Sequence, residues 1–121
     1  MKQEDSLQIA VMSYIRLQYP DVLAFHVANE RKTSPMAGAK LKKKGVLAGV
    51  ADVLIFRYKE NPGNFEKHPQ RCGLAIELKV GKNKQTPSQL KFQQMITAEK
   101  WQYHVCYDFD TAREIIDKYL S

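Results

Sequence analysis

Two carboxylates and one ammonium group of this chain stand in or beside apolar, strand-like segments: Asp52, Glu77 and Lys79. Side chains alternate along a strand, so Glu77 and Lys79 point to one face while Ile76 and Leu78 point to the other. Charged side chains in an apolar strand are costly to bury unless they pair or bind something. We therefore interpret these three charged residues as a candidate site.

The chemistry that such a set can perform is phosphodiester hydrolysis assisted by a divalent cation. Mg²⁺ and Mn²⁺ prefer oxygen ligands, and Mg²⁺ commonly takes one or two carboxylates. Asp52 and Glu77 supply them if their strands are neighbours, and the peptide carbonyl of Leu78 can add a third oxygen. Lys79 can orient the attacking water or neutralise charge on the phosphate. The alternative is an aspartate at a strand entrance and a Glu–Lys pair on a solvent-facing strand, which needs no ligand.

The positive charge of the chain is concentrated in two segments, one between Arg31 and Ala51 and one that follows the strand with Glu77. The formal net charge is +6, and no acidic residue follows Arg31 until Asp52. Phosphate backbones attract basic patches, and this attraction weakens with salt. A basic face that contacts only solvent is the alternative. The residues that we predict to contact DNA are Arg31, Lys32, Lys40, Lys42, Lys43, Lys44, Lys82 and Lys84.

The apolar periodicity predicts a helix and three strands in the first two thirds of the chain. The helix covers residues 5–19 and ends at Pro20, which cannot continue it. The strands are expected at 23–27, 50–56 and 74–80. The residues 29–49 are predicted to form a long basic loop, and loops of this length are usually functional or mobile.

The last third of the chain predicts a helix, a strand and another helix. Thr86 is a good helix cap, Pro87 suits the first helical position, and Gln89 lies three residues after the cap. This helix is expected to run to about Glu99, followed by a strand over 103–107 and a helix opened by Thr111. The order predicts a single α/β domain over 1–121 with a mixed sheet flanked by helices, plus a C-terminal helix.

Composition excludes several protein classes. The hydrophobic fraction is 44%, and no apolar stretch reaches the roughly 18 residues of a membrane span. The first residues lack the apolar core of a secretory signal. The two cysteines, Cys72 and Cys106, are far apart and lack metal-ligand spacing. These features predict a cytoplasmic protein with reduced thiols and no membrane partner.

Several segments together resemble one nuclease family. Asp52 followed by Glu77-Leu78-Lys79 is similar to the D…(D/E)-X-K signature of the PD-(D/E)XK superfamily. That signature is weak alone, because it often arises by chance. The segments His26–Asn29, Lys44–Asp52 and Thr86–Gln89 narrow the resemblance to the small stand-alone virus-type replication-repair nucleases, the VRR-NUC family. The resemblance covers nearly the whole chain.

The resemblance implies a fold and a set of site residues. The implied fold is an αβββαβ restriction-endonuclease-like core, with Mg²⁺ or Mn²⁺ bound at Asp52 and Glu77 and a catalytic role for Lys79. Gln89 matches a family glutamine that supports the lysine or the water. Glu4 matches a glutamate of the first helix that commonly joins the site.

One departure from the family pattern is Ala51, where many relatives carry proline before the aspartate. Proline at that position shapes the backbone and brings no reactive group, so the departure does not count against activity.

The resemblance also implies an activity and an assembly. We expect a metal-dependent endodeoxyribonuclease that acts on Holliday junctions or other branched DNA, in a bacterial cell or a phage-infected host. Stand-alone members resemble dimeric resolvases, which predicts a homodimer. Tyr14, Tyr19 and Trp101 are candidate dimer contacts, with packing inside one chain as the favoured alternative. The alternative functions are a catalytically inactive nucleic-acid-binding module and a scaffold subunit of a replication or repair complex.

Overall fold

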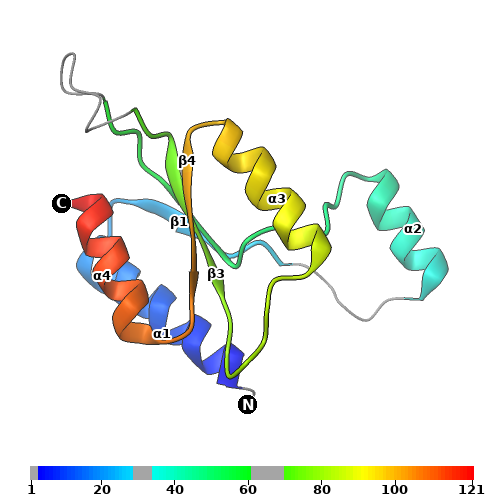
Figure 1. The fold of residues 1–121 in the computed structure, drawn as a ribbon, viewed down its shortest axis with the longest axis horizontal. Coiled ribbons are helices and arrows are strands. Elements are labelled where there is room, and N and C mark those ends of the chain that lie inside the picture. The colour runs from blue at the N-terminus through cyan, green and yellow to red at the C-terminus, as the bar shows by residue number, and fades with distance from the viewer. Residues whose placement is uncertain (1–2, 29–33, 61–69) are drawn as a thin grey trace.

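The computed structural model describes residues 3–28, 34–60 and 70–121 (Figure 1). None of the helices within these ranges is both long enough and apolar enough to cross a membrane. The elements are α1 (Gln3–Gln18), β1 (Leu23–Phe25), α2 (Pro35–Lys43), β2 (Val53–Phe56), β3 (Gly73–Leu78), α3 (Pro87–Ala98), β4 (Trp101–Cys106) and α4 (Phe109–Leu120).

The four strands form one mixed sheet in the order β1-β2-β3-β4. β1 pairs with β2 and β2 pairs with β3 in antiparallel fashion, whereas β3 and β4 are parallel. The parallel pair is joined through α3, as a crossover connection requires. This architecture confirms the predicted α/β fold with a mixed central sheet flanked by helices. β3 lies between β2 and β4 in this order, and all six of its residues are buried.

Alternation along the strands divides the core between the two faces of the sheet. One face packs against α1 and α4, which lie on the same side of the sheet in Figure 1, and contributes Val53, Ile55, Leu74, Ile76 and Leu78. The other face packs against α3, and the smaller cluster there joins Ala51, Leu54 and Ala75 to Phe92 of α3. Glu77 alternates with Ile76 and Leu78, so its side chain lies on the α3 side.

The predicted basic loop was wrong over residues 35–43, where the structure has helix α2. The Ser34 hydroxyl accepts a hydrogen bond from the Ala37 amide at 3.1 Å, and Pro35 occupies the first turn. This is a regular helix N-terminus, and the basic composition of the segment obscured it. No residue of α2 is buried, and α2 extends away from the sheet beyond α3 in Figure 1.

The ends of other elements also differ from prediction. The last helix begins at Phe109 instead of Thr111, because the Asp108 carboxylate caps it by accepting the Thr111 amide at 2.8 Å. The first three strands are shorter than predicted and the fourth begins two residues earlier, at Trp101. β1 ends at Phe25, so His26 follows the strand and is exposed.

The three aromatic residues considered for a dimer contact pack within the chain. The hydroxyls of Tyr14 and Tyr19 both donate to Asp117 Oδ1, at 2.5 and 2.6 Å, and so join α1 to α4. The indole of Trp101 lies on Gly73, where an added Cβ would meet the ring at 2.5 Å. The favoured alternative, packing inside one chain, is therefore the arrangement found.

Candidate active site

Asp52 lies directly before β2 and is held by the ends of both neighbouring strands. Its Oδ2 accepts a hydrogen bond from the Leu78 amide at 2.7 Å, which links it to the end of β3. Its peptide carbonyl lies 2.7 Å from Nδ1 of His26, just beyond β1. A carbonyl can only accept, so Nδ1 carries the proton in this contact. The carboxylate is thereby oriented by the main chain of the very strand that carries Glu77.

Glu77 is a buried carboxylate at the centre of the site, only 1% exposed. Its Oε2 accepts a hydrogen bond from Gln89 Nε2 at 3.1 Å and lies 3.8 Å from Lys79 Nζ. Its other oxygen, Oε1, is buried without a hydrogen-bond partner. The predicted juxtaposition of Glu77 and Lys79 on one face is confirmed, but the alternative of a solvent-facing pair is wrong because Lys79 is also buried.

The carboxyl groups of Glu77 and Asp52 lie close together in a site that is largely shielded from water, and their negative charge dominates its electrostatics. Burial raises the pKa of the Glu77 carboxyl well above its usual range, and the Asp52 carboxylate raises it further. Lys79 acts in the opposite direction, and Glu4 adds a smaller increase. One buried lysine therefore does not compensate the carboxylates. A proton or a bound cation is needed to stabilise them together.

Gln89 reaches Glu77 because the first turn of α3 orients its amide. Gln89 Oε1 accepts a hydrogen bond from the Thr86 amide at 2.8 Å, and Thr86 Oγ1 accepts one from the Gln89 amide at 3.3 Å. This capping box confirms the helix start that the sequence predicts. With its oxygen occupied by the cap, the side-chain amide presents its nitrogen to Glu77. The same residue thus caps α3 and binds the buried carboxylate.

Gly49 allows the segment before Asp52 to pack against that helix turn. Its φ of +86° is in the region that favours glycine. A Cβ at this position would lie 2.3 Å from the Ser88 carbonyl oxygen and 2.7 Å from the Gln89 amide nitrogen. The close approach brings the two segments that carry Asp52 and Gln89 together at one end of the sheet.

The two other predicted site residues, Glu4 and Leu78, contribute no side-chain hydrogen bond to the site. Glu4 lies in the first turn of α1, and its charge acts on Glu77, but no hydrogen bond joins it to the site. Within 3–28, 34–60 and 70–121, no three His, Cys, Asp or Glu side chains form a group that could hold a metal. The predicted ligand set of two carboxylates and the Leu78 carbonyl does not require such a group. The Leu78 side chain itself is in the core on the opposite face.

Two further groups near the carboxylates are absent from the predicted site. The apolar surroundings of His26 in the sequence indicate a core or rim histidine with its polar atoms satisfied, and in the structure it is exposed and contacts the Asp52 carbonyl. Burial, together with the Glu77 charge, raises the pKa of Tyr103 to about 12, and its hydroxyl accepts a hydrogen bond from Gln85 at 3.1 Å. Neither contact can be predicted from a short sequence pattern, since each joins segments that meet only in the folded chain.

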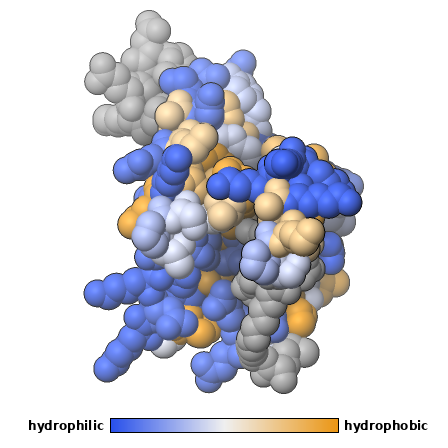
Figure 2. Space-filling model, turned by 90° about the vertical axis from the view of Figure 1, so that its right-hand side faces the viewer, coloured by the Kyte–Doolittle hydropathy of each residue, from blue (hydrophilic) through white to orange (hydrophobic). Residues whose placement is uncertain are grey.

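The basic residues predicted to contact DNA lie in three parts of the chain. Lys40, Lys42 and Lys43 are on α2 and Lys44 caps its C-terminus, all of them exposed. Lys82 and Lys84 are exposed between β3 and α3, whereas Arg31 and Lys32 lie outside the described residues. Figure 2 looks at the side on which α2 lies and shows hydrophilic residues around smaller apolar patches.

Comparison with known proteins finds similarity among solved structures. No protein-family model matches the chain, and no curated protein matches it. The chain is similar to a solved structure described as a "VRR_NUC domain protein", with a TM-score of 0.75 and 25% sequence identity. The similarity covers 98% of this chain and 88% of that one. The similarity therefore spans nearly the whole of this chain.

Proposed function

Because the chain belongs to the VRR-NUC nuclease family, we propose that it is a divalent-metal-dependent endonuclease that hydrolyses phosphodiester bonds in DNA. The observation that carries the proposal is the buried carboxylate of Glu77, with one oxygen unpaired and with Asp52, Lys79 and Gln89 around it. A module that only binds DNA has no need of buried carboxylates, which repel phosphate. A scaffold subunit would also leave these residues without a role.

The donor set fits Mg²⁺ or Mn²⁺. Asp52 and Glu77 would hold the ion, with the Leu78 carbonyl as a further oxygen ligand, because hard cations prefer oxygen donors. The unpaired Glu77 Oε1 and the uncompensated charge of the two carboxylates support this assignment. When bound, the ion would supply Lewis-acid activation of the phosphate and of water.

The remaining site residues have roles that follow from their contacts. Lys79, 3.8 Å from Glu77 Oε2, can orient the attacking water and neutralise charge that develops on the phosphate. Gln89 holds the Glu77 carboxylate in one orientation through its hydrogen bond. His26 holds the peptide carbonyl of Asp52. We assign Glu4 a supporting role through its charge at the site.

We further propose that the substrate is branched DNA, such as a Holliday junction, and that the active species is a homodimer. The exposed lysines of α2 support contact with several phosphates. One chain carries one candidate site, whereas symmetrical resolution of a four-way junction needs two nicks. A two-fold dimer would present two sites to a two-fold substrate.

The decisive experiment is a cleavage assay with labelled Holliday junction, flap and linear duplex, each with Mg²⁺, Mn²⁺ or EDTA. We expect cutting of the branched substrates with either metal and none with EDTA. Absence of cutting under every metal condition would overturn the proposal. Light scattering across micromolar concentrations tests the dimer, and a monomeric mass where junctions are cut would contradict it.

A further inference from the structure

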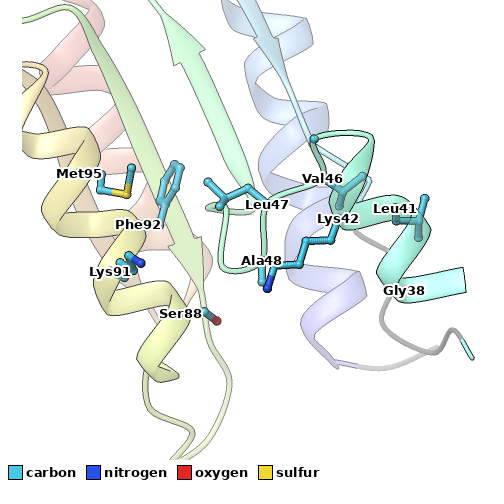
Figure 3. A pocket seen from close by; sticks show the side chains of 11 residues that line it. Gly38, Leu41, Lys42, Val46, Leu47, Ala48, Ser88, Lys91, Phe92 and Met95 are labelled. Atoms are coloured by element: carbon cyan, nitrogen blue, oxygen red, sulfur yellow. The ribbon is translucent and has the colours of Figure 1, made fainter. Parts of the chain in front are cut away.

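A hollow of about 650 Å³ opens between α3 and the segment that contains α2 (Figure 3). Its walls are largely apolar, and in Figure 3 the side chain of Leu47 points across it toward Phe92. Leu47 is 50% exposed and Met95, on the α3 wall, is 53% exposed. An exposed apolar hollow of this size is typical of a binding site.

The charges around this hollow are of one sign. Lys42 lines it from α2 and Lys91 from α3, and among the described residues that line it none is acidic. Three further lysines, Lys40, Lys43 and Lys44, are on or directly after α2. An occupant that complements these walls combines an apolar group with attached anionic groups. A nucleotide within a DNA strand has this combination.

Two residues that line the hollow are direct sequence neighbours of residues that build the candidate active site. Ser88 lines it, and the next residue, Gln89, donates to Glu77 at 3.1 Å. Ala48 also lines it, and the next residue, Gly49, packs against Ser88. A DNA strand with a phosphate at the carboxylates would therefore pass a neighbouring nucleotide over the opening.

We propose that this hollow receives the base of an unpaired nucleotide adjacent to the scissile phosphate. A base within a duplex has both faces stacked and its edge paired, so it cannot enter an apolar pocket without leaving the helix. An unpaired base is free to contact the exposed side chains of Leu47 and Met95 and the small exposed part of Phe92. This inference rests on the proposed nuclease function and narrows its substrate to DNA with an unpaired nucleotide beside the cut, which a flap presents directly and a Holliday junction presents only where a base pair opens at the branch point.

DNA binding measured in EDTA, without the metal that cleavage would need, tests the hollow separately from cleavage. The probes are a flap duplex with 2-aminopurine as the first unpaired nucleotide at the branch, and a linear duplex with 2-aminopurine paired to thymine. We expect the protein to change the fluorescence of the flap probe only. Leu47→Gln with Met95→Gln should weaken flap binding roughly tenfold and leave duplex binding unchanged, because apolar contact with the base is lost and the charge is constant. Leu17→Gln, at a 79% exposed leucine of α1, is the matched control and should change neither.

Three outcomes would overturn the inference. The first is equal affinity and no fluorescence change with both probes, and the second is an equal effect of the double variant on both. The third is a loss of dimer mass in the double variant without selective loss of flap binding, which would show that a second copy of the chain covers the hollow. Failure to cut DNA with Mg²⁺ or Mn²⁺ would instead count against the nuclease function, since the binding assay uses no metal.

Discussion

Gln89 Nε2 donates to Glu77 Oε2 at 3.1 Å while the oxygen of the same amide closes the capping box of α3. The two residues are 12 positions apart, on a helix and on a central strand. Reversal of the Gln89 amide would break both bonds at once, because its oxygen cannot donate to Glu77. The helix start thus determines which atom faces the buried carboxylate.

This relationship predicts the effect of Gln89→Glu. Glutamate also closes a capping box, so circular dichroism should show the parental helix content. The added carboxylate lies beside Glu77, so the melting temperature should fall. Glutamate cannot donate to Glu77, and the cleavage rate at saturating Mg²⁺ should fall about 10- to 100-fold, as for other residues that orient metal ligands. Thr86→Ala is the control, expected to cost about 1 kcal/mol of stability with little loss of rate. Parental cleavage by Gln89→Glu would show that the bond is dispensable.

The carboxylates themselves should be indispensable for cutting and dispensable for folding. Glu77→Gln and Asp52→Asn remove the negative charge at nearly constant volume. We expect no detectable cleavage, with circular dichroism and DNA affinity close to those of the parent protein. Single-turnover assays with excess enzyme separate the chemical step from release of product. A parental rate in either variant would place the metal site elsewhere.

Gly49 should be sensitive to a single methyl group. In Gly49→Ala the Cβ would meet the Ser88 carbonyl at 2.3 Å, and the residue would keep a φ of +86°. Left-handed backbone strain alone costs on the order of 1–3 kcal/mol, and the clash adds to it. Gly45→Ala is a matched control, because Gly45 also has a positive φ but has nothing within 4 Å of its Cβ position. Denaturant unfolding should show a clearly larger loss for Gly49→Ala than for Gly45→Ala.

The Tyr14–Asp117–Tyr19 contact should make stability depend on pH at both ends of the range. Hydrogen bonds from Tyr14 and Tyr19 lower the pKa of Asp117 below its usual value near 3.9. A lowered pKa means that the contribution is complete above about pH 4 and is lost as pH falls through the folded value. The hydrogen bond to Asp117 also raises the pKa of Tyr19 to about 12, so a second loss is expected as pH rises from about 10 to 12.

Asp117→Asn tests this contact by thermal unfolding at several pH values. We expect a loss of roughly 1 kcal/mol at pH 7, since the carboxylate is partly exposed and solvent screens it. The loss should shrink as pH falls below 4 and through the lowered pKa of Asp117, where the parent carboxylate becomes protonated too. Arg113 also pairs with Asp117 at 3.6 Å, so Arg113→Ala is the control that separates the ion pair from the tyrosine bonds. A pH-independent difference would contradict the assignment.

The lysines of the α2 segment should bind DNA without reading its sequence. Replacing Lys42, Lys43 and Lys44 with Ala should weaken binding to all DNA alike. The slope of log affinity against log salt should fall by about 0.9 for each phosphate that the variant no longer neutralises. Fluorescence anisotropy at several salt concentrations measures this slope. Unchanged affinity at low salt would place these lysines away from DNA.

Local patterns in the sequence determined the direction of two site side chains and the start of one helix. Strand alternation placed Glu77 and Lys79 on one face, because side-chain direction follows from the backbone repeat alone. The Thr86–Gln89 capping box is equally local and was predictable. Ser34-Pro35 is a local signal of the same kind, and the prediction of a loop over α2 was wrong because it gave the basic composition more weight than the capping residues.

Only the tertiary structure decided how the site is assembled. The Asp52 carboxylate meets the Leu78 amide across 26 residues, and His26 meets the Asp52 carbonyl across another 26. The burial of Glu77 likewise depends on the packing of the other elements around β3, which no single segment encodes. Short-range periodicity fixes the direction of a side chain along its own strand. Its partners depend on strand order and register, which form only when the chain closes long loops and buries its core.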